Sequence, residues 1–141
     1  MLFKKYSEHG YEIYLQGDAD GRGPGVLDSL IKKCSLAPDN TFMFDYDFET
    51  SIPAALLLRA LQSLGELEHV SIDEFRARVS PISGPVGPVM KSAFGLELKP
   101  LKIDLAVATA DLLNATDARW SSNDDFMKTE LGRFLHFVRR A

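Results

Sequence analysis

Cysteine is almost absent from the sequence. Cys34 is the only one, so no disulfide can form within the chain. The simplest expectation is a reducing compartment. The opening residues, MLFKKYSEHGYE, lack the apolar core of a signal peptide. The longest apolar run, residues 52–58, is interrupted by Pro53 and is too short to span a bilayer. We therefore predict a cytoplasmic protein that does not enter membranes.

Histidine and strong charge of one sign are also scarce. The three histidines, His9, His69 and His136, are far apart, and no two have the spacing of metal ligands. The net charge is −4, and the basic residues are scattered, which argues against nucleic-acid binding. The sequence contains neither a nucleophile-elbow motif nor the Gly-Lys-Ser/Thr of a phosphate-binding loop. We therefore predict no catalytic set, no metal ligands and no cofactor.

The length and composition predict one domain. A chain of 141 residues with 45% hydrophobic residues can bury enough surface to fold without disulfides or metals. Residues 80–88, SPISGPVGP, contain three prolines and two glycines. This composition predicts an irregular loop rather than a helix or strand. We interpret it as a loop within a single α+β domain covering residues 1–141.

The N-terminal region has the pattern of a hairpin followed by a helix. Residues 2–7 and 11–16 favour β-structure, and the Glu8-His9-Gly10 link fits a tight antiparallel turn. Residues 17–25, GDADGRGPG, then form a glycine-rich loop. Such a loop before a helix can hold a phosphate, and its aspartates suggest Ca²⁺ instead, but neither motif is complete. A plain surface loop is the simpler interpretation.

The clearest pattern in the chain is residues 41–50, TFMFDYDFET. Aromatic residues occupy every second position, which is typical of a half-buried β-strand. One face is predicted to carry four rings, those of Phe42, Phe44, Tyr46 and Phe48. The opposite face is predicted to carry three carboxylates, those of Asp45, Asp47 and Glu49. We expect this segment to be the central strand of the fold.

Helical patterns dominate the rest of the chain. Ser51 and Pro53 are predicted to open a helix that runs to about Leu64, and an extended segment is predicted over residues 96–103. Another helix should begin at Asp104, and a long C-terminal helix should follow a cap at Ser122 or Asn123. Its buried stripe is predicted to comprise Met127, Leu131, Phe134, Leu135 and Val138. The resulting architecture is a mostly antiparallel or mixed sheet packed by several helices.

The acidic face of residues 41–50 is the predicted functional surface. Carboxylates two positions apart on a strand lie roughly 6.5–7 Å apart on one side. Asp18 and Asp20 would join Asp45, Asp47 and Glu49 if the early strand and the central strand are neighbours. The acidic balance and the lack of a catalytic set favour a protein-binding or inhibitory module. A toxin-neutralising immunity protein is one example, and its partner would have a basic surface.

The alternative function is enzymatic. Asp45, Asp47 and Glu49 could coordinate Mg²⁺ through oxygen ligands and water, as in a small phosphoryl-transfer or hydrolytic enzyme. The two hypotheses differ in shape, because an enzyme needs a concave site and a binding module needs an exposed face. The sequence favours the binding module and indicates no particular oligomeric state.

Overall fold

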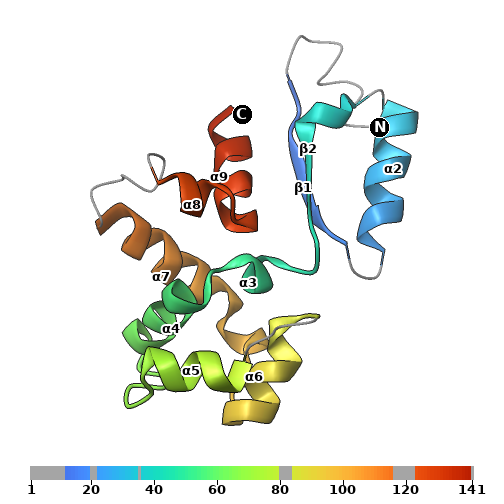
Figure 1. Ribbon diagram of the computed structural model, residues 1–141. Coiled ribbons are helices and arrows are strands. Elements are labelled where there is room, and N and C mark those ends of the chain that lie inside the picture. Colours follow the sequence, from blue (N-terminus) through green and yellow to red (C-terminus); the bar gives the residue numbers. More distant parts are fainter. Residues whose placement is uncertain (1–11, 20–21, 35, 80–83, 116–122, 141) are drawn as a thin grey trace.

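The computed structural model describes residues 12–19, 22–34, 36–79, 84–115 and 123–140. In these residues the chain forms eight α-helices and one two-stranded sheet, so the predicted α+β class is confirmed (Figure 1). The strands are β1 (Leu15–Asp18) and β2 (Thr41–Phe44). The helices are α2 (Gly23–Cys34), α3 (Phe48–Ser51), α4 (Ala54–Ser63), α5 (Ile72–Val79), α6 (Val86–Phe94), α7 (Lys102–Ala115), α8 (Asp124–Met127) and α9 (Glu130–Arg140). Within this part of the chain, no helix is long and apolar enough to cross a membrane.

The two strands are parallel, and the predicted antiparallel or mixed arrangement is wrong for the described sheet. Leu15 pairs with Thr41, and Asp18 pairs with Phe44. The reason lies between the strands, where α2 carries the chain back to the start of the sheet. A crossover helix makes two neighbouring strands run in the same direction. The predicted first hairpin strand, residues 2–7, lies outside the described residues.

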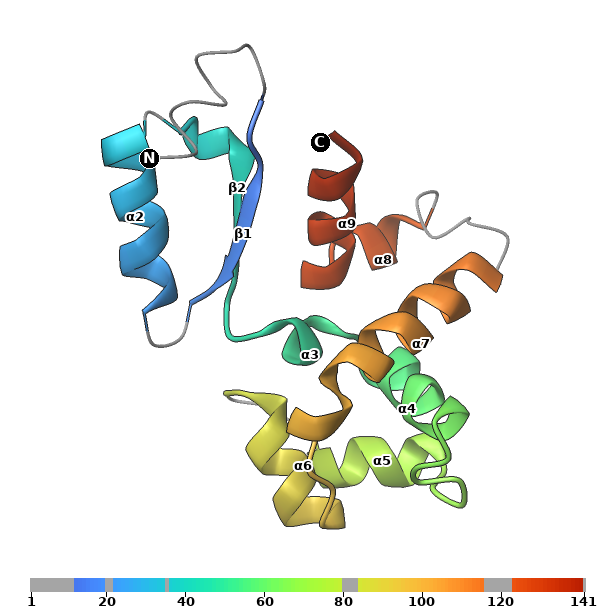
Figure 2. The same cartoon turned by 180° about the vertical axis from the view of Figure 1, so that it is seen from behind.

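Helices cover both faces of the small sheet. Figures 1 and 2 show α2 on one side of β1 and β2 and α9 on the other. Gly17 of β1 lies against α2 so closely that an added Cβ would be 3.2 Å from a Leu27 methyl carbon. On the opposite face, the rings of Phe42 and Phe44 lie 5.3 and 4.8 Å from the ring of Phe134 on α9. The sheet is therefore a thin layer between two helices.

Strand β2 ends at Phe44, so residues 41–50 do not form one continuous strand. The chain turns because Asp47 starts α3, where its side chain accepts a hydrogen bond from the Thr50 amide at 2.8 Å. Phe48 still packs its ring against Phe44 at 6.0 Å. Tyr46 leaves the predicted aromatic face and is 40% exposed.

The remaining helices enclose a second part of the core. Large side chains from α4 to α7 are fully buried there, among them Leu57, Leu61, Phe75, Met90 and Leu105. Helix α6 begins at Val86, inside the predicted irregular loop of residues 80–88. A helix tolerates proline in its first turn, where backbone amides have no helical partner. Residues 80–83 lie outside the described part of the chain.

Three further predictions about the C-terminal half are wrong. The predicted extended segment is instead a 3₁₀ turn, Lys99–Leu101, that leads into α7. The predicted long C-terminal helix is divided into α8 and α9, because the Thr129 hydroxyl caps a new helix by accepting a hydrogen bond from the Gly132 amide at 3.0 Å. The register of α9 also differs, since Phe137 is buried and Val138 is exposed.

Candidate functional site

The carboxyl ends of the two parallel strands meet at one edge of the sheet. Asp18 is the last residue of β1 and pairs with Phe44, so Asp45 follows directly at the same edge. The early strand and β2 are therefore neighbours, which is the condition under which Asp18 would join the predicted acidic surface. In open sheets with parallel strands, ligands bind outside the carboxyl ends of the strands. The location therefore suits a binding site.

Glu130, the first residue of α9, completes the acidic edge. The backbone amide of Asp45 donates a hydrogen bond to Oε2 of Glu130 at 3.1 Å, across 85 positions of sequence. The sequence contains no signal that connects these two residues, because their contact depends on how α9 packs against the sheet. Asp45 is exposed and Glu130 is half-buried. Two carboxylates from distant segments thus lie together at the surface.

The environment of Glu130 disfavours its ionised form. Partial burial raises the pKa of the Glu130 carboxyl, and the side chain of Asp45 raises that pKa further. The hydrogen bond from the Asp45 amide and the positive charge of Arg133 act in the opposite direction. The net result is a raised pKa. Because like charges repel at this site, a cation that lies between the carboxylates would relieve the repulsion.

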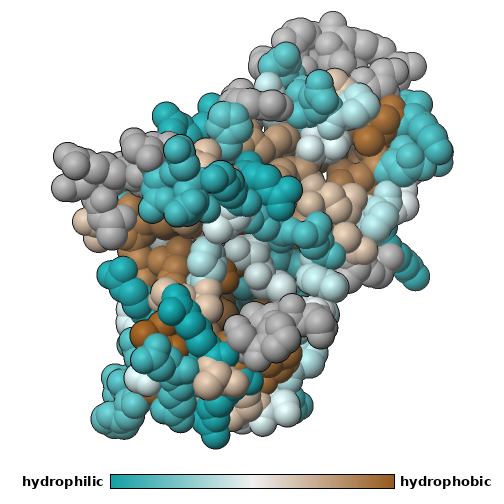
Figure 3. All heavy atoms as spheres, viewed as in Figure 1, coloured by the Kyte–Doolittle hydropathy of each residue, from teal (hydrophilic) through white to brown (hydrophobic). Residues whose placement is uncertain are grey.

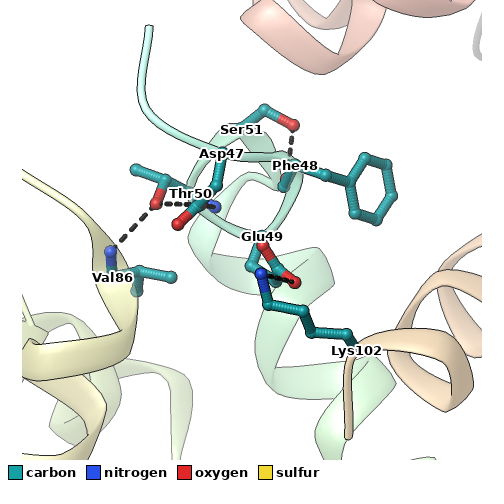
Figure 4. Close-up of polar contacts among 7 residues, drawn as sticks. All are labelled: Asp47, Phe48, Glu49, Thr50, Ser51, Val86 and Lys102. Atoms are coloured by element: carbon teal, nitrogen blue, oxygen red, sulfur yellow. Dashed lines mark hydrogen bonds and ion pairs between the residues drawn. The ribbon is translucent and has the colours of Figure 1, made fainter. Parts of the chain in front are cut away.

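Asp47 and Glu49, the other two predicted carboxylates, have structural contacts. Asp47 accepts hydrogen bonds from both the amide and the hydroxyl of Thr50. The Thr50 hydroxyl in turn accepts a hydrogen bond from the Val86 amide at 2.9 Å, which connects α3 to the start of α6 (Figure 4). Asp47 therefore caps a helix and positions a neighbouring one.

Glu49 is only 5% exposed and forms an ion pair with Lys102. Figure 4 shows the Lys102 side chain reaching from the start of α7 toward Glu49, and their charged atoms are 3.5 Å apart. A carboxylate buried to this degree needs a partner, because removing a charge from water is costly. The pair connects α3 to α7.

A small pocket lies between α3, α6 and α7. Its volume is about 200 Å³, smaller than pockets for drug-sized ligands, which are roughly 300–1,000 Å³. The lining residues are Asp47, Glu49, Gly87, Leu98, Lys99 and Lys102. The negative charges of two carboxylates and the positive charges of two amines balance in this pocket. The pocket is therefore a polar gap at a junction of helices, and it lacks the excess negative charge of the predicted acidic face.

The predicted acidic surface is thus divided among different environments. Asp45 is exposed at the sheet edge, Asp47 caps α3, and Glu49 is buried against Lys102. Asp18 stands at the same edge as Asp45, whereas Asp20 lies outside the described residues. Across the described ranges, no three or more histidine, cysteine, aspartate or glutamate residues are grouped as a metal site requires.

Comparison with known proteins adds no further assignment. No family model, curated protein or solved structure matches this chain. Any functional conclusion therefore depends on the geometry of the acidic edge and on the surface around it.

Proposed function

We propose that this protein is a protein-binding module that holds a basic partner at the acidic edge formed by Asp45 and Glu130, with Asp18 beside it. The contact between Asp45 and Glu130 is the observation that carries the proposal. It holds two carboxylates together at the surface, where Asp45 disfavours the ionised form of Glu130. An inhibitory protein that neutralises a basic toxin is the specific form we favour.

The energetics of the edge support a cationic contact. A lysine or arginine from a partner would offset the repulsion between the two carboxylates, so part of the binding energy comes from relief of an unfavourable interaction. The net charge of −4 would also attract a basic partner over longer distances. Asp47 and Glu49 contribute indirectly in this proposal, because they anchor the segment that follows Asp45.

Co-purification tests the proposal. Tagged wild-type protein, prepared from native lysate under several growth conditions, should retain a stoichiometric basic partner. The variant Asp45→Asn/Glu130→Gln should lose it, because both substitutions keep the shape of the side chain and remove the charge. A matched variant, Glu68→Gln/Asp73→Asn, removes two exposed carboxylates elsewhere and should retain the partner. Retention by the first variant, or no partner under any condition, would refute the proposal.

The pH dependence gives a second test on the recovered complex. A bound cation favours ionised Glu130, whose pKa is raised in the free protein. Binding should therefore release protons, and affinity should increase as the pH rises through the pKa of Glu130. Titration calorimetry in buffers of different ionisation enthalpy measures this proton release. An affinity that does not change with pH would contradict a role for Glu130.

The magnesium-dependent enzyme is the competing hypothesis. A ligand that binds only the native state must raise the unfolding temperature. Wild-type protein should show no increase with millimolar Mg²⁺ or Ca²⁺ if the acidic edge serves only a protein partner. An increase that Asp45→Asn/Glu130→Gln abolishes would favour the metal-dependent enzyme instead.

A further inference from the structure

Helix α7 carries apolar residues on both sides. Leu105 and Ala108 face the core and are buried. On the outer side, Ile103 is 80% exposed and Val107 is 55% exposed. A helix that is apolar around its circumference is normally covered on more than one side. Within the described residues, the outer side of α7 has no such cover.

A groove runs along the same helix beside α4. Its volume is about 450 Å³. The lining residues are Ser63, Leu64, Asp104, Val107, Ala108, Asp111, Leu112 and Ala115. The residues from α7 recur at intervals of three and four, so the groove follows one stripe of the helix. Figure 3 shows hydrophobic side chains, in brown, gathered over the region of α4 and α7.

Asp104 and Asp111 give the groove two negative charges along α7. Both carboxylates line it, and no basic residue is among the described residues that do. They are seven positions apart, which corresponds to about 10.5 Å along a helix axis. A partner helix with basic residues one heptad apart would match this spacing.

We infer that the α4/α7 groove binds an amphipathic helix from a basic partner protein. The apolar stripe of that helix would fill the groove over Val107 and the neighbouring exposed Ile103. Lysine or arginine residues flanking the stripe would lie opposite Asp104 and Asp111. This is the helix-in-groove mode of recognition, in which apolar anchors supply affinity and charges at the rim supply orientation. The surface is separate from the Asp45–Glu130 edge, so the inference does not depend on the function proposed there.

Charge distinguishes this partner from a second copy of the chain. A two-fold dimer would place the same surface on both sides of the interface. It would bring Asp104 and Asp111 near the same two residues of the second copy, so that carboxylates would face carboxylates. Like charges across an interface disfavour association. A basic partner has the complementary pattern.

A synthetic peptide provides the probe. An 18-residue helical peptide with one leucine stripe flanked by lysines should bind the full chain, as measured by fluorescence anisotropy. The variant Ile103→Ser/Val107→Ser should bind at least about tenfold more weakly, because it removes the exposed apolar anchors without changing charge. A matched variant, Val26→Ser/Val138→Ser, removes exposed valines from α2 and α9 and should bind like the wild type. Circular dichroism should confirm that both variants remain folded.

Further measurements distinguish the proposed basic helix from other occupants of the α4/α7 groove. A peptide with glutamate in place of lysine should bind at least about tenfold more weakly, and Asp104→Asn/Asp111→Asn should reduce the salt dependence of binding. Asp45→Asn/Glu130→Gln should bind the lysine peptide like the wild type. Equal binding of the two peptides, or equal binding by Ile103→Ser/Val107→Ser and its matched control, would overturn the inference. So would a dimer in light scattering that Ile103→Ser/Val107→Ser converts to a monomer.

Discussion

Replacing Lys102 with methionine should destabilise the protein because it leaves the buried Glu49 carboxylate without a counter-charge. At 3.5 Å the two charges attract each other by roughly 5 kcal/mol at an effective dielectric constant of 20. Lys102 is about half exposed, so water replaces part of that attraction. We therefore expect a loss of about 2 kcal/mol in the free energy of unfolding, near the usual cost of an unpaired buried polar group.

A double-mutant cycle isolates this interaction. Urea unfolding of the wild type, Lys102→Met, Glu49→Gln and the double variant gives the coupling free energy between the two side chains. Lys102→Met should cost much less in the Glu49→Gln background, where no charge is left unpaired. Lys99→Met is the matched control, because Lys99 lines the same pocket and has no described ion pair with Glu49. An equal cost in both backgrounds, or an equal cost for Lys99→Met, would refute the reasoning.

Three further predictions follow from other contacts. Thr50→Val removes the hydroxyl that accepts the hydrogen bond from the Val86 amide, and it should lower the free energy of unfolding by about 1–2 kcal/mol in urea titrations. An unchanged unfolding midpoint would show that this hydrogen bond does not stabilise the protein. Glu130→Gln should raise the free energy of unfolding slightly at pH 7, within the range of about 0.5 kcal/mol that is usual for surface substitutions. The reason is that a raised pKa means that stability present at low pH is lost as Glu130 ionises. That gain should vanish below pH 4, and a gain independent of pH would contradict its cause. Gly132→Ala should cost more than about 1 kcal/mol in thermal unfolding, because its Cβ would overlap the carbonyl oxygen of Phe126 in α8. Gly25→Ala, with open space around it, should not destabilise the protein.

Local patterns in the sequence predicted all of β2 but placed the end of the strand too late. Alternating aromatic residues correctly indicate a strand from Thr41 to Phe44. The same alternation continues to Phe48, but Asp47 and Thr50 also have the spacing of a helix cap, and the cap determines the structure. Two local signals competed there, and the hydrogen bond to a backbone amide at the start of α3 outweighed the favourable pattern of a longer strand.

Contacts between distant segments could not be predicted from local sequence patterns. Asp45 meets Glu130, and Glu49 meets Lys102, only because α7 and α9 pack around α3. The parallel strand order had a readable signal, since a glycine-rich turn and a helix separate β1 from β2. The division of the C-terminal helix also had one, because Thr129 can cap a new helix. Both signals were weaker than the patterns that predicted an antiparallel hairpin and a single C-terminal helix.

The position of α9 has a consequence for synthesis. The ribosome makes the sheet long before it makes the helix that covers the rings of Phe42 and Phe44. Leu131, on the same late helix, also contributes to the core shared by α4 to α7. A growing chain therefore exposes an aromatic surface until its residues near 130–137 leave the exit tunnel. During that interval it would be a substrate for chaperones that bind exposed hydrophobic segments.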